Sequence, residues 1–500
     1  MQDYNHDCMT LKIRLTLLAS LALTSTLILN AQAPTRAVVT IAHFNDVYEI
    51  GAVEGGKSGG LARVATTIAQ LKRTNAPLLV TLGGDYVSPS ALGTASVNGE
   101  ALAGKQMVDV LNATGLQVAT LGNHEFDISA AAFAARMTES KFKIVVTNVV
   151  DAQGQPFANT VTTHIVPMAA SGRTLRIGVI GIVTDANQKP WVKYLPPIDS
   201  AKSAVAQLTG KVDAIVALTH LTLAGDAELA IAVPEIDVIL GGHEHENWML
   251  RRGDHFTPII KADANVRSLA VVSMSFGARG ARPTVSARLQ IIDDQIKALP
   301  SVDALVKKWT ATAFDAFRRD GFAPEAAVVT LTEPLDGRET TIRNREGKLT
   351  QIIANAVRRE AKAEVGIFNG GSVRIDDVLT PGPLTEYDVI RVLPFGGRVV
   401  RASFDGAFLS KVLDQGLGNQ GTGGFLHTSD GTVRNSSGWM INGVPLDPAK
   451  RYVVGISDFL LTGGETNLGY LTRTNAGVHD PEDLRDVRRA VIDELKSIYK

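Results

Sequence analysis

The 500-residue sequence predicts an α/β protein with more than one domain. Short Val/Ile/Leu runs alternate with helical patterns from about residue 37 to residue 295, as expected for strands buried on both faces. A second segment of mixed pattern, rich in glycine turns, runs from about 326 to 500. Apolar residues make up 45% of the chain and charged residues 20%, so large cores are possible. The length favours two or more domains over one.

The first 33 residues have the pattern of a secretory signal peptide. Lys12 and Arg14 precede the apolar run 15–29, and the small-residue stretch Ala-Gln-Ala follows it. This run contains Ser and Thr and is short for a membrane span, which needs about 20 apolar residues. A cleaved peptide is therefore favoured over an uncleaved membrane anchor. The residues from Met9 onward are typical of such a peptide, which favours Met9 as the true start. We expect a periplasmic or secreted protein.

The charge balance and the cysteine count exclude several classes of function. Fifty basic and 51 acidic residues give a formal net charge of −1. This balance gives no electrostatic footprint for a nucleic acid polymer or an anionic membrane, so local groups would have to hold an anionic substrate. The single cysteine, Cys8, lies in the predicted signal peptide. A cleaved chain would therefore lack disulfides, cysteine-ligated zinc and thiol catalysis.

Several helices can be recognised along the chain. Residues 61–73 have apolar side chains at helical spacing, and residues 104–115 end at a glycine suited to a C-terminal cap. Residues 301–321 also have a helical pattern between two caps and are expected to connect two domains. The predicted organisation is a signal peptide at 1–33, a first domain at 37–298, a linker helix at 299–322 and a second domain at 323–500.

Polar residues follow five predicted strands of the first domain. These residues are Asp46, Asp85, Asn123 with His124, His220, and His243 with His245. Each one alone is more often a turn former or a hydrogen-bonded surface residue. However, five of the ten histidines, His43 included, lie within four positions of such a strand end. In an open α/β sheet ligands bind at the carboxyl ends of the strands, so the joint placement indicates one shared site.

The residue types at this site indicate catalytic metals. Carboxylate, amide and imidazole ligands without thiolate suit Zn, Mn, Fe, Co or Ni better than a sulfur-bound structural zinc. Two divalent ions need a bridging carboxylate and otherwise mostly neutral ligands, so that positive charge remains for an anionic substrate. Two Asp, one Asn and three His meet that requirement.

The spaced motifs resemble a known family. The sequences "GGD", "GNHEFD", "TH" and "GGHEH", in this order, closely resemble the calcineurin-like metallophosphoesterases, in particular the 5′-nucleotidase/UDP-sugar hydrolase family. The motifs span the first domain. The resemblance implies an N-terminal calcineurin-like metallophosphatase domain, which is a layered α/β/β/α sandwich. It also implies a C-terminal α/β 5′-nucleotidase substrate-binding domain.

The resemblance also implies a role for each residue. Asp85 would bridge two divalent metal ions, for which Zn, Mn and Co are candidates. The remaining metal ligands would be Asn123, His220 and His243 for one ion, and Asp46 and His245 for the other. His124 and Asp127 correspond to the catalytic pair: the carboxylate would hold the imidazole, which would stabilise the phosphoryl oxygens or protonate the leaving group. Glu125 and Glu244 are expected to be bystanders.

The chain departs from the family pattern at Tyr48. The family usually has Asp-x-His where this chain has Asp46, Val47 and Tyr48, so one metal ligand is replaced. Tyr48 could bind as a phenolate, pack without binding, or leave a coordination position to water. The last two are favoured because an unperturbed phenol keeps its proton near neutral pH. His43 points elsewhere along the extended strand and is expected to have a supporting role.

Three stretches of the second segment resemble the substrate domain of the family. They are "FNGGSVR" (368–374), "LPFGG" (393–397) and "SDFLLTGGE" (457–465), which would otherwise be interpreted as turns. The implied substrate-binding residues are Arg343, Asn369, Arg374, Phe395, Phe459 and Glu465. Phe395 and Phe459 would stack on a nucleobase, and the Asn and Arg side chains would contact phosphate or sugar. Glu465 stands where the family commonly has Asp for the ribose hydroxyls.

The sequence thus predicts a dinuclear-metal phosphoester hydrolase that releases phosphate from nucleoside 5′-monophosphates. Nucleotide diphosphate sugars and 2′,3′-cyclic nucleotides are further candidate substrates. Two alternatives stay open: a nucleotide-binding protein with an impaired metal site, and a phosphatase for a non-nucleotide phosphoester. No nucleic acid polymer and no stable membrane span after signal cleavage are expected.

Overall fold

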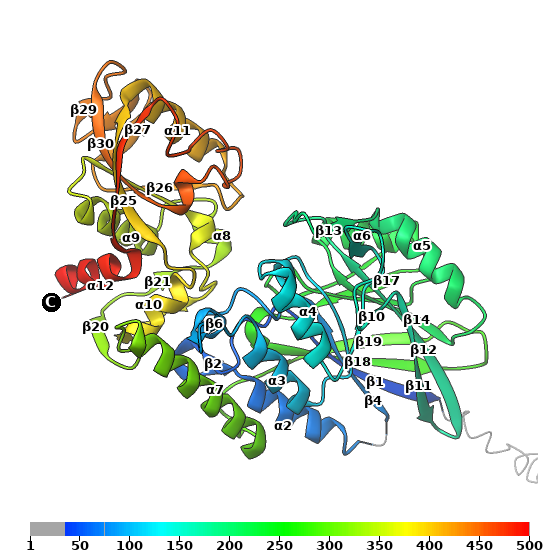
Figure 1. Cartoon of the computed structure of the whole chain (residues 1–500). Coiled ribbons are helices and arrows are strands. Elements are labelled where there is room, and N and C mark those ends of the chain that lie inside the picture. The colour runs from blue at the N-terminus through cyan, green and yellow to red at the C-terminus, as the bar shows by residue number, and fades with distance from the viewer. Residues whose placement is uncertain (1–35, 75, 500) are drawn as a thin grey trace, which may run out of the picture.

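The computed structural model describes residues 36–74 and 76–499. An N-terminal domain runs from β1 to β19, the helix α7 follows it, and a C-terminal domain runs from β20 to α12 (Figure 1). The expected signal peptide at 1–33 lies outside the described residues. Within the described ranges, no helix combines the length and the apolar character needed to cross a membrane.

Two sheets form the centre of the N-terminal domain. The first sheet contains, in spatial order, β10 (Thr160–Val161), β8 (Lys143–Val145), β7 (Val118–Thr120), β4 (Leu78–Gly83), β1 (Ala37–Phe44), β18 (Ser268–Phe276) and β19 (Thr284–Ile291). The second contains β11 (Thr163–Ala170), β12 (Arg173–Val183), β14 (Ala214–His220), β15 (Val238–Gly241), β17 (Thr257–Lys261) and β16 (Trp248–Arg252). The central strands of both sheets pair in parallel.

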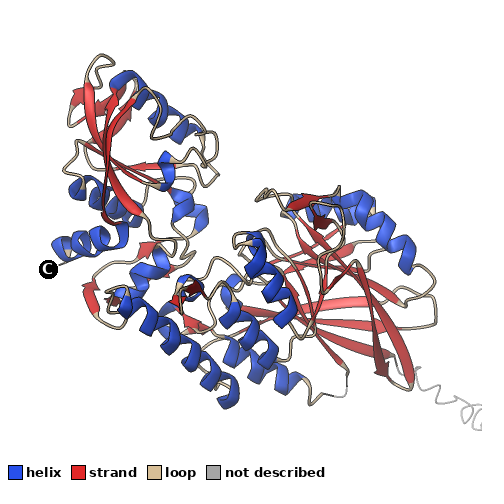
Figure 2. Cartoon of the chain, viewed as in Figure 1, coloured by secondary structure: helices blue, strands red, loops and turns tan. Residues whose placement is uncertain are grey.

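Helices cover the outer faces of both sheets (Figure 2). They are α2 (Leu61–Leu71), α3 (Lys105–Thr114), α4 (Ala130–Glu139), α5 (Pro197–Leu208) and α6 (Leu223–Ala232). In β14, Val216 and Leu218 face the core between the sheets, whereas Ile215 and Ala217 face the core under α5 and α6. Both faces of the strand are buried, which explains its continuous apolar sequence. The result is the α/β/β/α layering that was expected.

Short paired strands decorate this domain. They are β2 (Ala52–Val53) with β3 (Ser58–Gly59), β5 (Ser96–Val97) with β6 (Glu100–Ala101), and β9 (Val149–Asp151) with β13 (Val192–Tyr194).

The C-terminal domain is built on one five-stranded sheet. Its spatial order is β26 (Leu426–Thr428), β22 (Val365–Asn369), β30 (Arg451–Ser457), β25 (Arg398–Asp405) and β31 (Val478–Asp486). Its helices are α8 (Glu339–Ile342), α9 (Lys348–Glu360), α10 (Glu386–Val392), α11 (Gly406–Gly418) and α12 (Val487–Ile498). The smaller strands are β20 (Ala327–Leu331) with β24 (Gly382–Thr385), β21 (Leu335–Asp336) with β23 (Val378–Leu379), and β27 (Thr432–Asn435), β28 (Gly438–Ile441) and β29 (Val444–Pro445). Apolar side chains of α9 and α12 pack together, while α11 contributes to a separate core with β25 and β30.

The helix α7 (Pro300–Arg319) packs on the N-terminal domain rather than crossing open solvent. It lies against α2 and α3, and its Trp309 Nε1–H donates to Asp109 Oδ2 at 2.9 Å. Phe314 contacts Tyr387 of α10, with ring centroids 4.8 Å apart. One apolar core therefore runs from the N-terminal domain through α7 into the C-terminal domain.

Two buried histidines make the folded state sensitive to acid. His43 is fully buried, with Nδ1 3.0 Å from Thr81 Oγ1 and Nε2 3.1 Å from the Gly241 carbonyl oxygen. His427 Nε2–H donates to the Ile342 carbonyl oxygen at 2.7 Å. Burial lowers the pKa of each imidazole to about 4. The unfolded chain, with a histidine pKa near 6.5, then binds more protons than the folded chain between about pH 4 and pH 6.5.

We therefore expect the free energy of unfolding to fall by about 2 kcal/mol for each of these histidines between pH 7 and pH 5. Urea unfolding in the presence of chelator at both pH values measures the fall. His427→Gln keeps a donor but does not titrate, so the variant should lose less stability on acidification than the wild type. His255→Gln, at an exposed position, is the control. Equal losses in wild type and His427→Gln would contradict the expectation.

Candidate metal centre and active site

The carboxyl ends of five strands deliver the predicted metal ligands to one edge of the N-terminal domain. Asp46 follows β1, Asp85 follows β4, Asn123 follows β7, His220 ends β14, and His243 and His245 follow β15. Asp46, Asp85 and His245 are buried, and each offers one ligand atom within 4.8 Å of the others. The fold therefore gathers residues from distant parts of the sequence into one group.

The remaining imidazoles lie against these carboxylates. His220 Nε2 lies 3.2 Å from Asp85 Oδ2 and 3.8 Å from Asp46 Oδ1. Its Nδ1–H donates to the Gly83 carbonyl oxygen at 2.8 Å, which holds Nε2 toward the carboxylates. The ring of His243 lies beside that of His220, with centroids 5.2 Å apart. The backbone N–H of His243 donates to Asp46 Oδ2 at 2.9 Å.

Four of the proposed ligands have a left-handed backbone conformation. Their φ angles are +52° for Asp46, +55° for Asp85, +87° for His243 and +60° for His245. This region is unfavourable for residues other than glycine, and such residues concentrate at functional sites. Backbone hydrogen bonds hold the strained loops: Asp46 N–H donates to Gly84 at 3.1 Å, and Asn265 N–H donates to Asp46 at 2.7 Å.

The residues fit a divalent metal ion. Asn123 Oδ1 and His220 Nε2 are buried and have no hydrogen-bond partner within the part of the chain that the structure describes. Buried polar atoms are rarely left unsatisfied, and both atoms belong to predicted ligands. Amide oxygen, carboxylate and imidazole are donors that divalent ions accept.

The electrostatics agree with this fit. Although burial raises its pKa, Asp85 has a pKa well below its usual range because His220 and His124 lie close to it. Burial opposes charge on His220, but Asp85 and Asp46 raise its pKa to about 9. Burial and neighbouring His220 lower the pKa of His243 to about 3. A metal ion bound here would compete with a proton for His220 Nε2.

Tyr48 points into the group of ligand atoms. Its hydroxyl lies 2.8 Å from His245 Nε2, 3.2 Å from Asp85 Oδ2 and 3.4 Å from Asp46 Oδ1. Burial and the two carboxylates raise the pKa of Tyr48 well above 10. The ring therefore lies within the group of predicted ligand atoms, and packing without binding or leaving a coordination position to water stay the favoured hypotheses for this residue.

Tyr48→His is expected to raise the affinity for one of two zinc ions about tenfold at pH 7, because a neutral imidazole replaces a phenol that holds its proton. Zinc titration of chelator-treated protein measures the affinity. Tyr48→Phe is the matched variant, since it removes the hydroxyl without adding a ligand. A similar gain in Tyr48→Phe would show that the hydroxyl merely obstructs the site.

The predicted catalytic pair lies on one short turn. The 3₁₀-helix η3 (His124–Phe126) places His124 Nδ1 2.7 Å from Asp127 Oδ2. Asp127 also accepts hydrogen bonds from Ser88 Oγ at 3.2 Å and from Asn187 Nδ2 at 2.8 Å. The backbone N–H of His124 donates to Asp85 Oδ1 at 2.8 Å, which joins the pair to a predicted metal ligand.

Arg374 of the C-terminal domain reaches this pair. Its Nη2–H donates to His124 Nε2 at 2.8 Å, and its Nη1 lies 3.5 Å from Glu339 Oε1. Because Nε2 accepts a hydrogen bond from arginine, it carries no proton, and the ring proton lies on Nδ1, which faces Asp127. The structure thus places a predicted substrate-binding guanidinium directly beside the predicted catalytic imidazole.

The other predicted substrate-binding residues are spread along the C-terminal domain. Asn369 Nδ2–H donates to Glu465 Oε2 at 2.6 Å, and Arg343 forms an ion pair with Glu339. Phe395 is 56% exposed and Phe459 is 43% exposed, so both rings have a free face. Phe395 lines a cavity of about 950 Å³ whose other lining residues include Asp127, Ser129 and Trp309.

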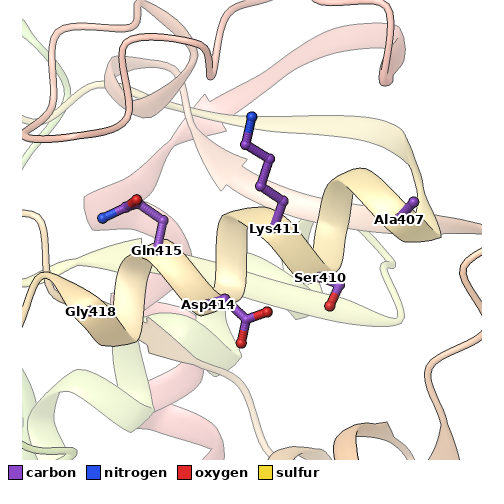
Figure 3. A pocket seen from close by; sticks show the side chains of 6 residues that line it. All are labelled: Ala407, Ser410, Lys411, Asp414, Gln415 and Gly418. Carbon is purple, nitrogen blue, oxygen red and sulfur yellow. The ribbon is translucent and has the colours of Figure 1, made fainter.

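A second hollow, of about 560 Å³, lies on α11 of the C-terminal domain (Figure 3). Its lining residues are Ala407, Ser410, Lys411, Asp414, Gln415 and Gly418. All come from one helix, and the Lys411 ammonium already lies 4.0 Å from the centre of the Tyr470 ring. The polar groups do not converge on a common point in Figure 3, and we assign this hollow no function.

Comparison with known proteins gives two family models, one for each domain. The calcineurin-like phosphoesterase family model matches residues 39–247, and the model of the 5′-nucleotidase C-terminal domain matches residues 327–471. The chain belongs to the 5′-nucleotidase family of calcineurin-like phosphoesterases. This confirms the family and the fold class that the spaced motifs predicted.

The relatives extend over most of the chain. Snake venom 5′-nucleotidase from Naja atra is 24% identical over 89% of this chain and 94% of its own length. Protein UshA from Yersinia enterocolitica is 24% identical over 85% of this chain and 86% of its own length. The crystal structure of a 5′-nucleotidase precursor from Thermus thermophilus superposes with a TM-score of 0.71 at 23% identity, covering 92% of this chain and 97% of that one. The last likeness establishes the shared fold.

Glu125, expected to be a bystander, holds together the two loops that carry Asp85 and Asn123. Its buried carboxylate accepts the backbone N–H groups of Asp85 at 3.0 Å, Tyr86 at 2.6 Å and Val87 at 3.1 Å. It also accepts the backbone N–H of Gly122. The loop that carries Asp85 and the loop that carries Asn123 are thus fixed to each other.

A buried lysine supports the opposite side of the site. Lys261 Nζ donates to the carbonyl oxygens of Leu221 and Gly242, both at 2.7 Å, and to Glu244 Oε2 at 2.5 Å. Asp226 Oδ2 lies 3.0 Å from the same ammonium. The local signal for this residue in the sequence is a lysine at the end of the apolar run "TPII". Glu244 lies between His243 and His245 and therefore anchors their loop to Lys261.

Proposed function

We propose that this protein releases phosphate from nucleoside 5′-monophosphates with two divalent metal ions. The observation that carries the proposal is the convergence of three groups: the buried ligand atoms of Asp46, Asp85 and His245, the catalytic pair, and Arg374 from the C-terminal domain. Family membership supports it, because 5′-nucleotidases are among the relatives that align over most of the chain. Nucleotide diphosphate sugars and 2′,3′-cyclic nucleotides are proposed as further substrates.

The metal ligands are assigned as follows. Asp85 would be shared by both ions; Asn123, His220 and His243 would hold one, and Asp46 and His245 the other. When bound, two divalent ions supply Lewis-acid stabilisation of the charge on the phosphoryl oxygens. We propose zinc, manganese or cobalt for these positions, since all accept mixed oxygen and nitrogen ligands.

The chain's own groups would perform the rest of the chemistry. Asp127 fixes the imidazole of His124 through Nδ1, so Nε2 is the atom that faces the substrate. The planar guanidinium of Arg374 suits two phosphate oxygens, and a bound phosphate would take its place against Nε2. Once Nε2 has also taken up a proton from water, His124 would be an imidazolium that stabilises the phosphoryl oxygens or gives the Nε2 proton to the leaving group.

The C-terminal domain would select the nucleoside. Phe395 and Phe459 offer exposed rings for stacking on a base, a contact that tolerates different bases. Asn369 and Glu465 form a polar pair suited to sugar hydroxyls, and Arg343 would assist in holding phosphate.

We further propose the domain limits 37–298 and 323–500, with 299–322 as the linker. Residues 1–33 would act as a signal peptide, so the enzyme would work in the periplasm or outside the cell. The charged n-region and apolar run of the sequence support this location.

A substrate panel on metal-reconstituted protein tests the function. We expect phosphate release from AMP in the presence of added zinc, manganese or cobalt. The activity should be lost when chelator is added and should return when the metal is restored. Stoichiometric metal binding without turnover of any phosphoester would favour a nucleotide-binding protein. Turnover of p-nitrophenyl phosphate without turnover of AMP would favour a non-nucleotide substrate.

The double variant Phe395→Ala, Phe459→Ala is expected to raise KM for AMP at least about tenfold, because each stacking contact contributes about 1–3 kcal/mol. Turnover of p-nitrophenyl phosphate, which carries no nucleobase, should stay near the wild-type rate. Phe256→Ala is the matched control, since Phe256 is also exposed but lies in the N-terminal domain. An unchanged KM for AMP in the double variant would contradict the stacking role.

A further inference from the structure

A segment of the C-terminal domain enters the metal centre of the N-terminal domain. Besides Arg374, it contains Asp376, whose Oδ2 lies 2.5 Å from His245 Nδ1. Both side chains are buried, at 7% and 8% exposure. The two residues are 131 positions apart in the sequence, and no motif of the sequence pointed to Asp376.

Each partner of this contact is fixed from its own side. The second oxygen of Asp376, Oδ1, accepts the backbone N–H of Glu339 at 2.8 Å, at the start of α8. On the far side of the imidazole, His245 Nε2 faces Tyr48 at 2.8 Å and Asp46 Oδ1 at 3.5 Å. The ring is therefore held at Nδ1 by one domain and presents Nε2 to the ligand atoms of the other domain.

This arrangement has a recognised physical effect. A metal-ligating histidine usually donates its second N–H to a carboxylate or carbonyl, which fixes the orientation of the ring and raises the basicity of the ligating nitrogen. In this chain the carboxylate that would do so comes from the opposite domain.

We propose that Asp376 is a positioning residue for His245, so that metal affinity at the Asp46 and His245 position depends on how the C-terminal domain is docked. The proposal rests on the metal-ligand role proposed for His245. Linkage is reciprocal, so a metal ion at this position also stabilises the docked arrangement. Arg374 makes a parallel contact to His124, but that contact faces the substrate and would be replaced when phosphate binds.

Asp377 provides a matched control. It is the next residue and is also buried, at 3% exposure. Its Oδ1 accepts the backbone N–H of Val378 at 2.7 Å, and its Oδ2 lies 3.7 Å from Arg391 Nη2. A change at Asp377 therefore removes an equally buried carboxylate from the same segment without touching His245.

The experiment compares full-length wild type with Asp376→Ala, Asp376→Asn and Asp377→Asn. Each protein is stripped with chelator, and zinc binding is measured by calorimetry with a competing chelator, without substrate. We expect Asp376→Ala to weaken one of the two zinc sites by about 10- to 100-fold and leave the other near its wild-type affinity. Asp376→Asn, which keeps an oxygen acceptor without the charge, should fall between, and Asp377→Asn should match the wild type.

Several outcomes would overturn the proposal. Unchanged zinc affinities in both Asp376 variants would do so, as would equal weakening in Asp377→Asn. If Asp376→Ala does not fold, the Asp376→Asn variant decides: it would overturn the proposal if it is as stable as the wild type and binds zinc with wild-type affinity. His245→Ala that still binds two zinc ions tightly would also overturn it. Zinc binding is measured without substrate, so a protein that fails to hydrolyse AMP can still confirm the coupling. Failure of the proposed function and failure of the Asp376 proposal are therefore distinguishable.

Discussion

Asp85→Asn is expected to lose metal binding and to reduce AMP hydrolysis by at least about a thousandfold, because metal stabilisation of the phosphoryl group is worth several kcal/mol. Asp85 is the only ligand proposed for both ions. Its Oδ2 lies 3.2 Å from both His220 Nε2 and the Tyr48 hydroxyl, and its Oδ1 accepts the backbone N–H of His124. Asparagine keeps the size of the side chain and one oxygen, but it removes the negative charge that the two metal ions would share.

Metal analysis of the purified variant and phosphate release from AMP measure this effect together. Asp237→Asn is a suitable control because Asp237 is also a buried carboxylate, yet its partners are the backbone of Ile215 and the side chain of Arg282. The control should keep both ions and near wild-type turnover. Two tightly bound ions in Asp85→Asn would refute the bridging role.

His124→Ala should lower kcat for AMP by about 10²- to 10⁴-fold while metal content stays at the wild-type value. The two ring nitrogens contact Asp127 and Arg374, and neither lies among the ligand atoms grouped around Asp46 and Asp85. The loss should therefore appear in the chemical step rather than in metal binding. Steady-state kinetics at saturating AMP, with metal analysis of the same sample, separates the two.

Asp127→Asn refines this result. The asparagine amide can still accept a hydrogen bond from His124 Nδ1 but carries no negative charge. The imidazole therefore keeps its position and loses its anionic partner, and we expect a smaller fall in kcat than in His124→Ala. His479→Ala is the control, since His479 pairs with Asp405 in the C-terminal domain. A His124→Ala protein that loses metal would instead indicate that His124 is a ligand.

The sequence predicted the family, the layered fold and a metal centre because the evidence is local. Each predicted ligand follows a buried strand, and the fold brings the carboxyl ends of neighbouring strands together regardless of the loop sequences. The same logic placed His124 and Asp127 on one turn from their spacing. The structure adds the position of the Tyr48 hydroxyl among the predicted ligand atoms.

What the sequence could not predict depends on contacts between distant residues. Glu125 looked like a bystander because its partners are backbone N–H groups of another loop, about 40 positions earlier. Every residue except proline has such a group, so the sequence does not indicate which ones a side chain will contact. Asp376 was missed because its contact to His245 exists only when the two domains are docked. Asn187, which holds Asp127, follows no motif at all.

The apolar core that passes from the N-terminal domain through α7 into the C-terminal domain has a consequence for how the molecule can be divided. Val302 and Phe317 of α7 share this core with Leu61 of α2 and with Ile352 of α9. The two domains recognised by the family models are thus not two independent cooperative units. A chain cut on either side of α7 would expose apolar surface that the intact protein hides, so truncations at the domain limits should aggregate rather than yield two separate soluble fragments.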